Sequence, residues 1–229
     1  MALVGTATDG ARTLAADVLQ RLRSDIVSCR LKPGAPLKFE TLKETYGASF
    51  STLREALTAL VSEGLVVSEG QRGFQVAPAS CSDLVDLTDS RVLIERELLR
   101  LAIEKGDDEW EVAATAALHR MSILEQRHPG KIYLSDDYKL AHKRFHEALV
   151  APSGSPILLG IRASLYARAE RYRSLSAIYR KTKRNKIGEH KAILEVVLAR
   201  KTEKALDMIE DHMRATTRNV LENAAEALS

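Results

Sequence analysis

Hydrophobic residues recur at helical spacing near the start of the chain. Four apolar residues follow one another at intervals of four, which predicts an amphipathic helix that ends near Cys29. These residues are Leu14, Val18, Leu22 and Ile26. A second, short helix fits residues 40–46, and a glycine at 47 is typical of a helix end.

A third helix and a hairpin complete the first module. The helix is expected to begin at Ser51, a candidate N-cap, and to end at Gly64. Two β-prone runs at 65–67 and 74–76 are joined by a segment rich in turn-forming residues, which predicts a β-hairpin. Three helices followed by a hairpin indicate a winged helix-turn-helix domain.

The pattern changes near residue 80, after the segment Ala-Pro-Ala-Ser. Beyond it, long helical patterns almost free of glycine and proline predict an antiparallel helical bundle. They fit residues 82–104, 108–127, 132–150, 154–180, 183–200 and 202–227. We therefore expect a mainly α protein with a winged helix-turn-helix over 1–77, a linker over 78–80 and an all-α bundle over 81–229.

Composition narrows the class of protein. Hydrophobic residues form 45% and charged residues 28% of the chain, the balance of a soluble globular protein. No apolar stretch is long enough to span a membrane, and the N-terminal residues lack the pattern of an export signal. Because two cysteines are too few for a disulfide framework, we expect free thiols and a cytoplasmic location.

The first module has the side chains to contact DNA. In a helix-turn-helix, the first residues of the second helix face base edges in the major groove. Hydroxyls and guanidinium groups there bond to phosphates or bases, and a cation at the hairpin tip adds a backbone contact. The candidates are Ser49, Ser51, Thr52, Arg54, Arg72 and Gly73. The alternative is a small structural domain whose polar helix start is merely capped. The net charge of +3 is small, so a few well-placed cations must supply the affinity.

The sequence G-A-S-F-S-T-L-R-E-A-L-T-A-L-V-S-E-G-L-V at 47–66, with R-G-F-Q-V at 72–76, resembles the GntR family of bacterial transcription regulators. The resemblance implies double-stranded DNA as a partner. Relatives usually carry an arginine where Phe50 stands here, so the usual operator sequence is not expected. A homodimer would place two recognition helices about one DNA turn apart, and the operator would then be a near-palindrome.

Four histidines in the bundle have spacings that bring them together. His142 and His146 are one turn apart on one helix face. His190 and His212 each lie 11 residues from Lys201, so a helix hairpin turning there would place them at similar height. Four imidazoles favour zinc, copper, nickel or iron-type cations over calcium or magnesium. The ordinary alternative is a set of buried core histidines.

The segments E-H-K-A-I-L at 189–194 and D-H-M at 211–213, with Phe145-His146, resemble the FCD ligand-binding domain of the FadR branch of the GntR family. That resemblance implies a divalent metal, held by an aspartate and three histidines, which binds a small organic acid. His146, His190 and His212 match the histidines, whereas His142 stands at the aspartate position. The loss of that negative charge favours zinc or nickel over manganese. A metal-free site, in which the imidazoles bind the acid directly, is the alternative.

Arginines are the candidates for effector binding, since a planar guanidinium pairs with a carboxylate through two hydrogen bonds. They are Arg91, Arg171 and Arg173. The segments at 109–111 and 169–173 resemble a carbon-starvation-induced repressor subgroup, which implies a short dicarboxylate. The alternative for each arginine is a place on the surface or in a dimer interface.

Together these features predict a ligand-responsive bacterial transcription regulator, a repressor and not an enzyme. A metal-dependent hydrolase is a weaker alternative: His142 and His146 have metalloprotease spacing, but Lys143 follows the first histidine where a glutamate base is required. A further alternative keeps DNA binding and makes the metal purely structural, with no effector.

Overall fold

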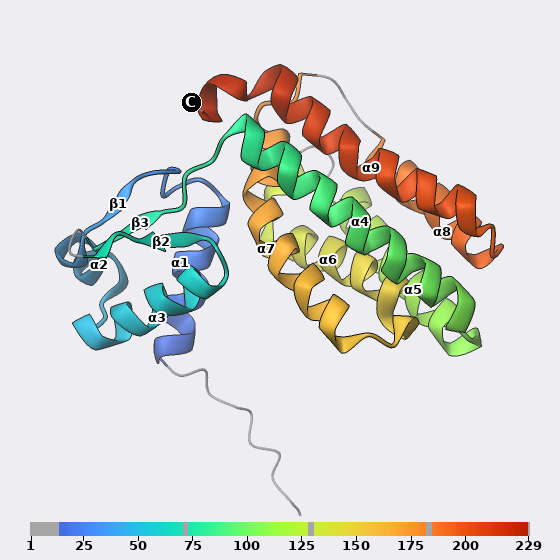
Figure 1. The fold of residues 1–229 in the computed structure, drawn as a ribbon, viewed down its shortest axis with the longest axis horizontal. Helices are drawn as coiled ribbons and strands as arrows, with labels where there is room; N and C mark the ends of the chain where they lie inside the picture. Colours follow the sequence, from blue (N-terminus) through green and yellow to red (C-terminus); the bar gives the residue numbers. More distant parts are fainter. Residues whose placement is uncertain (1–13, 71–72, 128–130, 182–184, 229) are drawn as a thin grey trace, which may run out of the picture. The chain divides into compact units, whose positions relative to one another are not determined.

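The computed structural model describes residues 14–70, 73–127, 131–181 and 185–228. Contacts between residues divide the chain into two compact units, 1–77 and 78–229 (Figure 1). The first unit combines three helices with a small sheet, and the second is helical throughout its regular structure. The chain is therefore mainly α, as the sequence predicts.

The first unit is a winged helix-turn-helix. Its elements are α1 (Leu14–Val27), β1 (Pro36–Leu37), α2 (Phe39–Tyr46), α3 (Phe50–Ser62), β2 (Val66–Ser68) and β3 (Phe74–Val76). The strands form an antiparallel sheet in the order β1-β3-β2, with Val66 opposite Val76. The hairpin is confirmed, whereas β1 was not expected: Pro36 and Leu37 pair with β3 outside the hairpin.

The turn between α2 and α3 corrects one prediction. Gly47 has a φ of 64° and closes α2 by donating its N–H to the Lys43 carbonyl. Ser49, not Ser51, is the N-cap of α3, because Ser49 has an extended backbone and its hydroxyl accepts the N–H of Thr52. Ser51 already lies within the helix, so the N-cap stands two residues earlier than predicted.

The second unit is a bundle of six α-helices among its described residues. They are α4 (Cys81–Lys105), α5 (Asp108–Arg127), α6 (Asp136–Val150), α7 (Pro156–Ile178), α8 (Lys186–Leu198) and α9 (Thr202–Asn223), with short 3-10 turns at Lys131–Leu134, Ala151–Ser153 and Ala225–Leu228. Helix α4 packs against α6, α7 and α9, and α8 packs against α5 and α9. Ser80, the last residue of the expected linker, is the N-cap of α4: its hydroxyl accepts the N–H of Asp83.

The connection between α8 and α9 is a tight turn held by Arg200. This residue has a φ of 54°, a left-handed conformation that lets the chain reverse. Its guanidinium donates to the carbonyls of Ile103 and Gly106 and stacks 4.8 Å from the Trp110 ring. The turn therefore fixes the register between α8 and α9, and with it the heights of the side chains that face the bundle interior.

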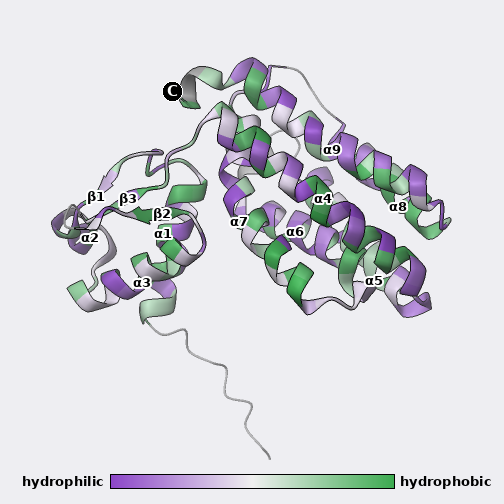
Figure 2. Cartoon of the chain, viewed as in Figure 1, coloured by the Kyte–Doolittle hydropathy of each residue, from purple (hydrophilic) through white to green (hydrophobic). Residues whose placement is uncertain are grey.

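The bundle helices carry both polar and apolar residues. Figure 2 shows hydrophilic and hydrophobic residues side by side along each helix. One apolar core joins all these helices except α7 through fully buried residues, among them Leu98, Phe145, Ile193 and Ile209. No helix in the described ranges is both long and apolar enough to cross a membrane.

Candidate metal centre and effector cavity

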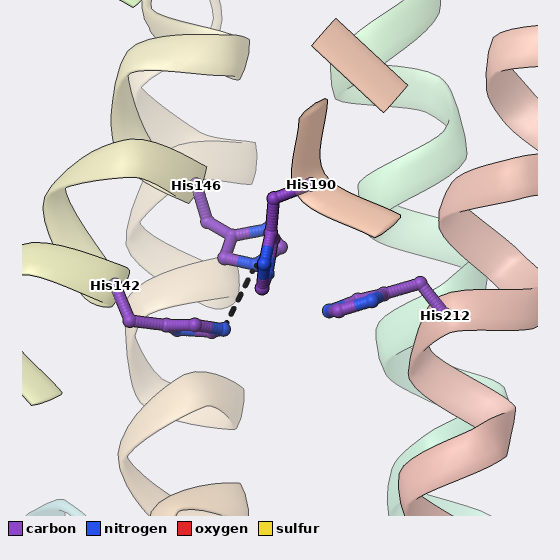
Figure 3. Close-up of side chains that lie close together, drawn as sticks. All are labelled: His142, His146, His190 and His212. Atoms are coloured by element: carbon purple, nitrogen blue, oxygen red, sulfur yellow. Dashed lines mark hydrogen bonds between the residues drawn. The ribbon is translucent and has the colours of Figure 1, made fainter. Parts of the chain in front are cut away.

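Four histidines converge inside the bundle. Helix α6 presents His142 and His146 on one face, α8 contributes His190, and α9 contributes His212 (Figure 3). One nitrogen of each ring lies within 4.8 Å of the corresponding nitrogen of the other three. The hairpin argument from the sequence therefore predicted the convergence of His190 with His212, whose ring centroids are 4.5 Å apart.

The distances between these nitrogens fit a metal ion. His146 Nε2 lies 3.2 Å from His142 Nε2 and 3.3 Å from His190 Nε2. Two ligands on a tetrahedral zinc ion, each at 2.0–2.1 Å, are about 3.3 Å apart. These two distances match that spacing, whereas the full set of four nitrogens extends to 4.8 Å, so the more distant rings must move inward to bind the same ion.

Neighbouring side chains orient the two outer histidines. His212 Nδ1 lies 2.9 Å from Glu189 Oε2, and His142 Nδ1 lies 3.3 Å from the Tyr166 hydroxyl. A histidine that ligates a metal through one nitrogen typically has the other nitrogen held in this way, often by a carboxylate. The Nε2 atoms of both rings are thereby left to face the centre.

Burial favours the neutral form of three of the four histidines. It lowers the pKa of His142, His146 and His190 well below the ordinary value of 6.5. The positive charge of Arg173 lowers the pKa of His142 further, and the neighbouring histidines act in the same direction. Neutral imidazole is the form that binds a metal, so the site favours its own metal-binding state.

A small cavity adjoins the cluster. Its volume is about 40 Å³ and its lining includes Arg91, His142, His146, Tyr166, Arg173 and His212. That volume holds about three water molecules. The threonines of α9, Thr216 and Thr217, add hydroxyl groups to the wall. The space therefore suits a compact polar molecule rather than a large one.

The three candidate effector arginines differ in their surroundings. Arg91 lines the cavity and makes no hydrogen bond or ion pair with any described residue, although Glu95 is close enough to oppose the effect of burial, which lowers the pKa of Arg91. Arg173 also lines the cavity, where it pairs with Glu170 and donates to the Tyr166 hydroxyl at 2.6 Å.

Arg171 lies elsewhere. It is buried and pairs with Asp83 at 3.1 Å, outside the residues that line the cavity. Two residues along a helix correspond to a rotation of about 200°, so Arg171 and Arg173 face opposite sides of α7. Arg171 does not line this cavity, so the effector site proposed below does not include it.

Sequence reasoning missed the ion pair between Glu95 and Arg162 and the position of Tyr166; Glu95 and Tyr166 line the cavity. Arg162 donates two hydrogen bonds to Glu95, at 2.8 and 2.9 Å, and both side chains are buried. The Tyr166 ring lies within 6 Å of the guanidinium groups of Arg91, Arg162 and Arg173. Glu95 and Arg162 lie on different helices and are 67 residues apart, so the sequence carries no spacing signal for their pair.

The candidate DNA-contacting residues lie at the start of α3 and near the tip of the hairpin. The hydroxyls of Ser51 and Thr52 each lie 2.9 Å from the Ser49 hydroxyl, and the Arg54 side chain is exposed. Gly73 has a φ of 90° just before β3, whereas Arg72 lies outside the described residues.

Sequence analysis did not place Phe50 on the DNA-facing surface. It is the first residue of α3 and is 55% exposed, with its ring 4.2 Å from the ring of Phe39. At the start of a recognition helix, an aromatic ring offers an apolar surface to thymine methyl groups, beside the hydrogen bonds that the hydroxyls can make to bases or phosphates.

Comparisons with known proteins support both units. The family model for bacterial regulatory proteins of the gntR family matches residues 14–76, and the FCD domain model matches residues 86–215. In the search of solved structures, the Escherichia coli McbR/YncC protein has a TM-score of 0.73 at 21% identity, over 92% of this chain and 98% of that one. This similarity shows a shared fold.

Two relatives extend the similarity along most of the sequence. The HTH-type transcriptional regulator BphR of Paraburkholderia xenovorans is 38% identical over 90% of this chain and 84% of its own. The HTH-type transcriptional repressor GlaR of Escherichia coli is 35% identical over 84% of this chain and 89% of its own. Domains and relatives alike are those of DNA-binding transcription regulators, not of enzymes. The chain belongs to the GntR family of bacterial transcription regulators, with an FCD domain after its DNA-binding domain.

Proposed function

We propose that this regulator is a repressor whose bundle binds a small dicarboxylic acid through a divalent metal held by the histidine cluster. Acid binding would change the affinity of the first unit for its operator. The observation that supports this function best is the juxtaposition of the cluster with a cavity that contains Arg91 without a hydrogen-bonded partner among the described residues.

The donor set favours zinc or nickel. All the candidate ligand atoms are imidazole nitrogens, which these ions prefer, while manganese prefers sites that include carboxylate oxygens. When bound, such an ion supplies positive charge and open coordination positions for a carboxylate. The residues of the chain then orient the acid.

A metal ion and Arg91 at the same cavity favour an acid with two carboxylates. A metal among the histidines would take one carboxylate, and Arg91 would take the other through two parallel hydrogen bonds. Arg173 is already paired with Glu170, so its role is to position Tyr166 and to add positive potential. The cavity of about 40 Å³ favours a short diacid.

The N-terminal unit would read a near-palindromic operator as part of a homodimer. The proposed contacts are Ser49, Ser51, Thr52, Arg54, Arg72 and Gly73. Repression is proposed because GlaR, 35% identical to this chain, is named a repressor. An effector that binds two arrangements of the dimer with different affinity shifts the balance between them.

Thermal melting tests the ligand site directly. Purified protein is melted with succinate or glutarate, and with butyrate as a one-carboxylate control, before and after chelation and then with zinc or nickel restored. We expect a rise in melting temperature with a diacid that disappears on chelation and returns with metal. A rise that survives chelation would contradict a metal-bound acid, and unfolding on chelation with no response to any acid would indicate a structural metal instead.

The Arg91→Gln variant tests binding of the second carboxylate separately from binding of the metal. Its metal affinity should equal that of wild type, while the response to the diacid should fall about tenfold or more. An unchanged response would remove Arg91 from the site.

A further inference from the structure

The two outer histidines of the cluster have partners of opposite kind. His212 Nδ1 faces the carboxylate of Glu189 at 2.9 Å, and His142 Nδ1 faces the hydroxyl of Tyr166 at 3.3 Å. A carboxylate only accepts hydrogen bonds, whereas a hydroxyl also donates one. The partners therefore place the single ring proton of a neutral histidine on different nitrogens.

For His212 the assignment is direct. Glu189 requires a donor, so His212 carries a proton on Nδ1, and the neutral form of the ring turns the lone pair of Nε2 toward the centre. This is the arrangement of a metal-ligating histidine supported by a carboxylate.

For His142 the assignment follows from the hydrogen bonds of Tyr166. Burial raises the pKa of the Tyr166 phenol, so the hydroxyl keeps its proton. Arg173 Nη1 donates to the Tyr166 oxygen at 2.6 Å and cannot accept, because a guanidinium has no acceptor atom. Among the described residues, the remaining partner of the hydroxyl is His142 Nδ1. His142 Nδ1 is thus the protein acceptor that the geometry offers to this hydroxyl, and we assign the Tyr166 hydrogen bond to it.

His142 then carries its proton on Nε2, the nitrogen that faces the centre. That atom lies 3.2 Å from His146 Nε2, a distance at which an N–H donates to a lone pair. A protonated nitrogen cannot bind a metal ion, but it can donate to an oxygen atom that does.

We propose that His142 is not a fourth metal ligand but the hydrogen-bond donor that binds the effector carboxylate, and that His146, His190 and His212 hold the metal. The assignment rests on the metal-bound acid proposed above and names the residue that selects it. A centre with three nitrogen ligands keeps a position open for a carboxylate oxygen. The Nε2–H of His142 binds the same carboxylate, and Tyr166 is the positioning residue that keeps this proton in place.

The tautomers are read by long-range ¹⁵N–¹H spectra of the histidine rings, in metal-free and zinc-loaded protein. We expect His142 to carry its proton on Nε2 in both states, and His212 to carry its proton on Nδ1. In Tyr166→Phe, His142 loses its hydrogen-bond donor and its proton should redistribute. A His142 proton on Nδ1 in the metal-free wild type would overturn the assignment, and this result does not depend on any metal being bound.

Metal affinity gives an independent test, measured by competition with a chelator of known zinc affinity. His142→Gln, which keeps an N–H donor, should retain zinc affinity within about threefold. The matched variants His146→Gln and His190→Gln should each lose more than about a hundredfold. An equal loss in His142→Gln would make His142 a ligand and overturn the proposal. Wild-type protein that binds no zinc would refute the proposed metal centre itself, and this role of His142 with it.

The acid response completes the test. His142→Ala, which has neither donor nor ligand, should bind zinc as His142→Gln does but lose the melting response to the diacid by tenfold or more. A full diacid response in His142→Ala would show that the acid does not use this residue.

Discussion

Glu189 Oε2 lies 2.9 Å from His212 Nδ1, across the interface of α8 and α9. Each of these helices also contributes a histidine to the cluster, so one contact joins the packing of the hairpin to the geometry of the candidate metal centre. The function proposed here depends on such supporting residues as much as on the nitrogens themselves.

Replacing Glu189 with glutamine should weaken metal binding without unfolding the bundle. The amide cannot hold the Nδ1–H of His212 as strongly as the carboxylate does, and loss of such a partner typically costs 10–100-fold in metal affinity. Chelator competition measures the change. Glu195→Gln, an exposed substitution on the same helix, is the control and should bind zinc as wild type does.

The buried ion pair between Glu95 and Arg162 should be essential for stability. The charge and hydrogen bonds of Glu95 more than offset the burial that would lower the pKa of Arg162. Glu95→Ala leaves that guanidinium without its partner and should cost about 3–5 kcal/mol of unfolding free energy in urea denaturation. Glu97→Ala, a change of a half-exposed residue that pairs with Arg100 on the same helix, should leave stability near wild type. A Glu95→Ala protein as stable as that control would be inconsistent with a buried pair.

The metal-free protein should lose stability in mild acid. Burial places the pKa of His142, His146 and His190 below the ordinary 6.5 of the unfolded chain, so the unfolded state takes up protons first as the pH falls. Stability from these groups is therefore complete above pH 6.5 and declines below it, by about 1.4 kcal/mol per pH unit for each histidine.

Urea denaturation between pH 7.5 and 5.5 measures this slope. His190→Asn removes one of the three groups and should reduce the slope by about a third. His119→Gln, a change of an exposed histidine on α5, is the control. An unfolding free energy that rises as the pH falls would contradict this prediction.

Phe50 should contact a thymine methyl group in the operator. Its exposed ring, held against Phe39, stands among the hydroxyls at the start of the recognition helix. Replacing that thymine with deoxyuracil in a selected operator should weaken wild-type binding about fourfold, equivalent to about 0.8 kcal/mol for one buried methyl group. Phe50→Arg should not distinguish the two bases, and equal wild-type affinity for thymine and uracil at every operator position would exclude the contact.

The sequence predicted the helices because their apolar spacing and glycine stops are local signals. It also predicted the meeting of His190 and His212, since a hairpin at Lys201 depends only on counting residues. The first residue of α3 was harder to predict. Ser49 and Ser51 can each cap a helix, and the choice between them depends on backbone angles.

Contacts between distant helices were the part that sequence could not supply. Arg171 and Arg173 are equivalent candidates for effector binding by residue type. They nevertheless lie on opposite sides of α7, because residues two apart on a helix differ by about 200°. Tyr166 has no sequence signal of its own, because its role depends on the position of its hydroxyl between Arg173 and His142. Such partners lie on different turns or different helices, where no periodic pattern connects them.

Operator binding in the presence of the acid tests the central claim most directly. A fluorescent operator fragment is titrated with zinc-loaded wild-type protein, with and without a short diacid, and then with Arg91→Gln. We predict that the diacid changes the wild-type affinity by at least about fivefold and leaves Arg91→Gln and chelated protein unaffected. Operator affinity that no diacid changes, with metal or without it, would contradict a regulator that senses an acid through the histidine-lined cavity.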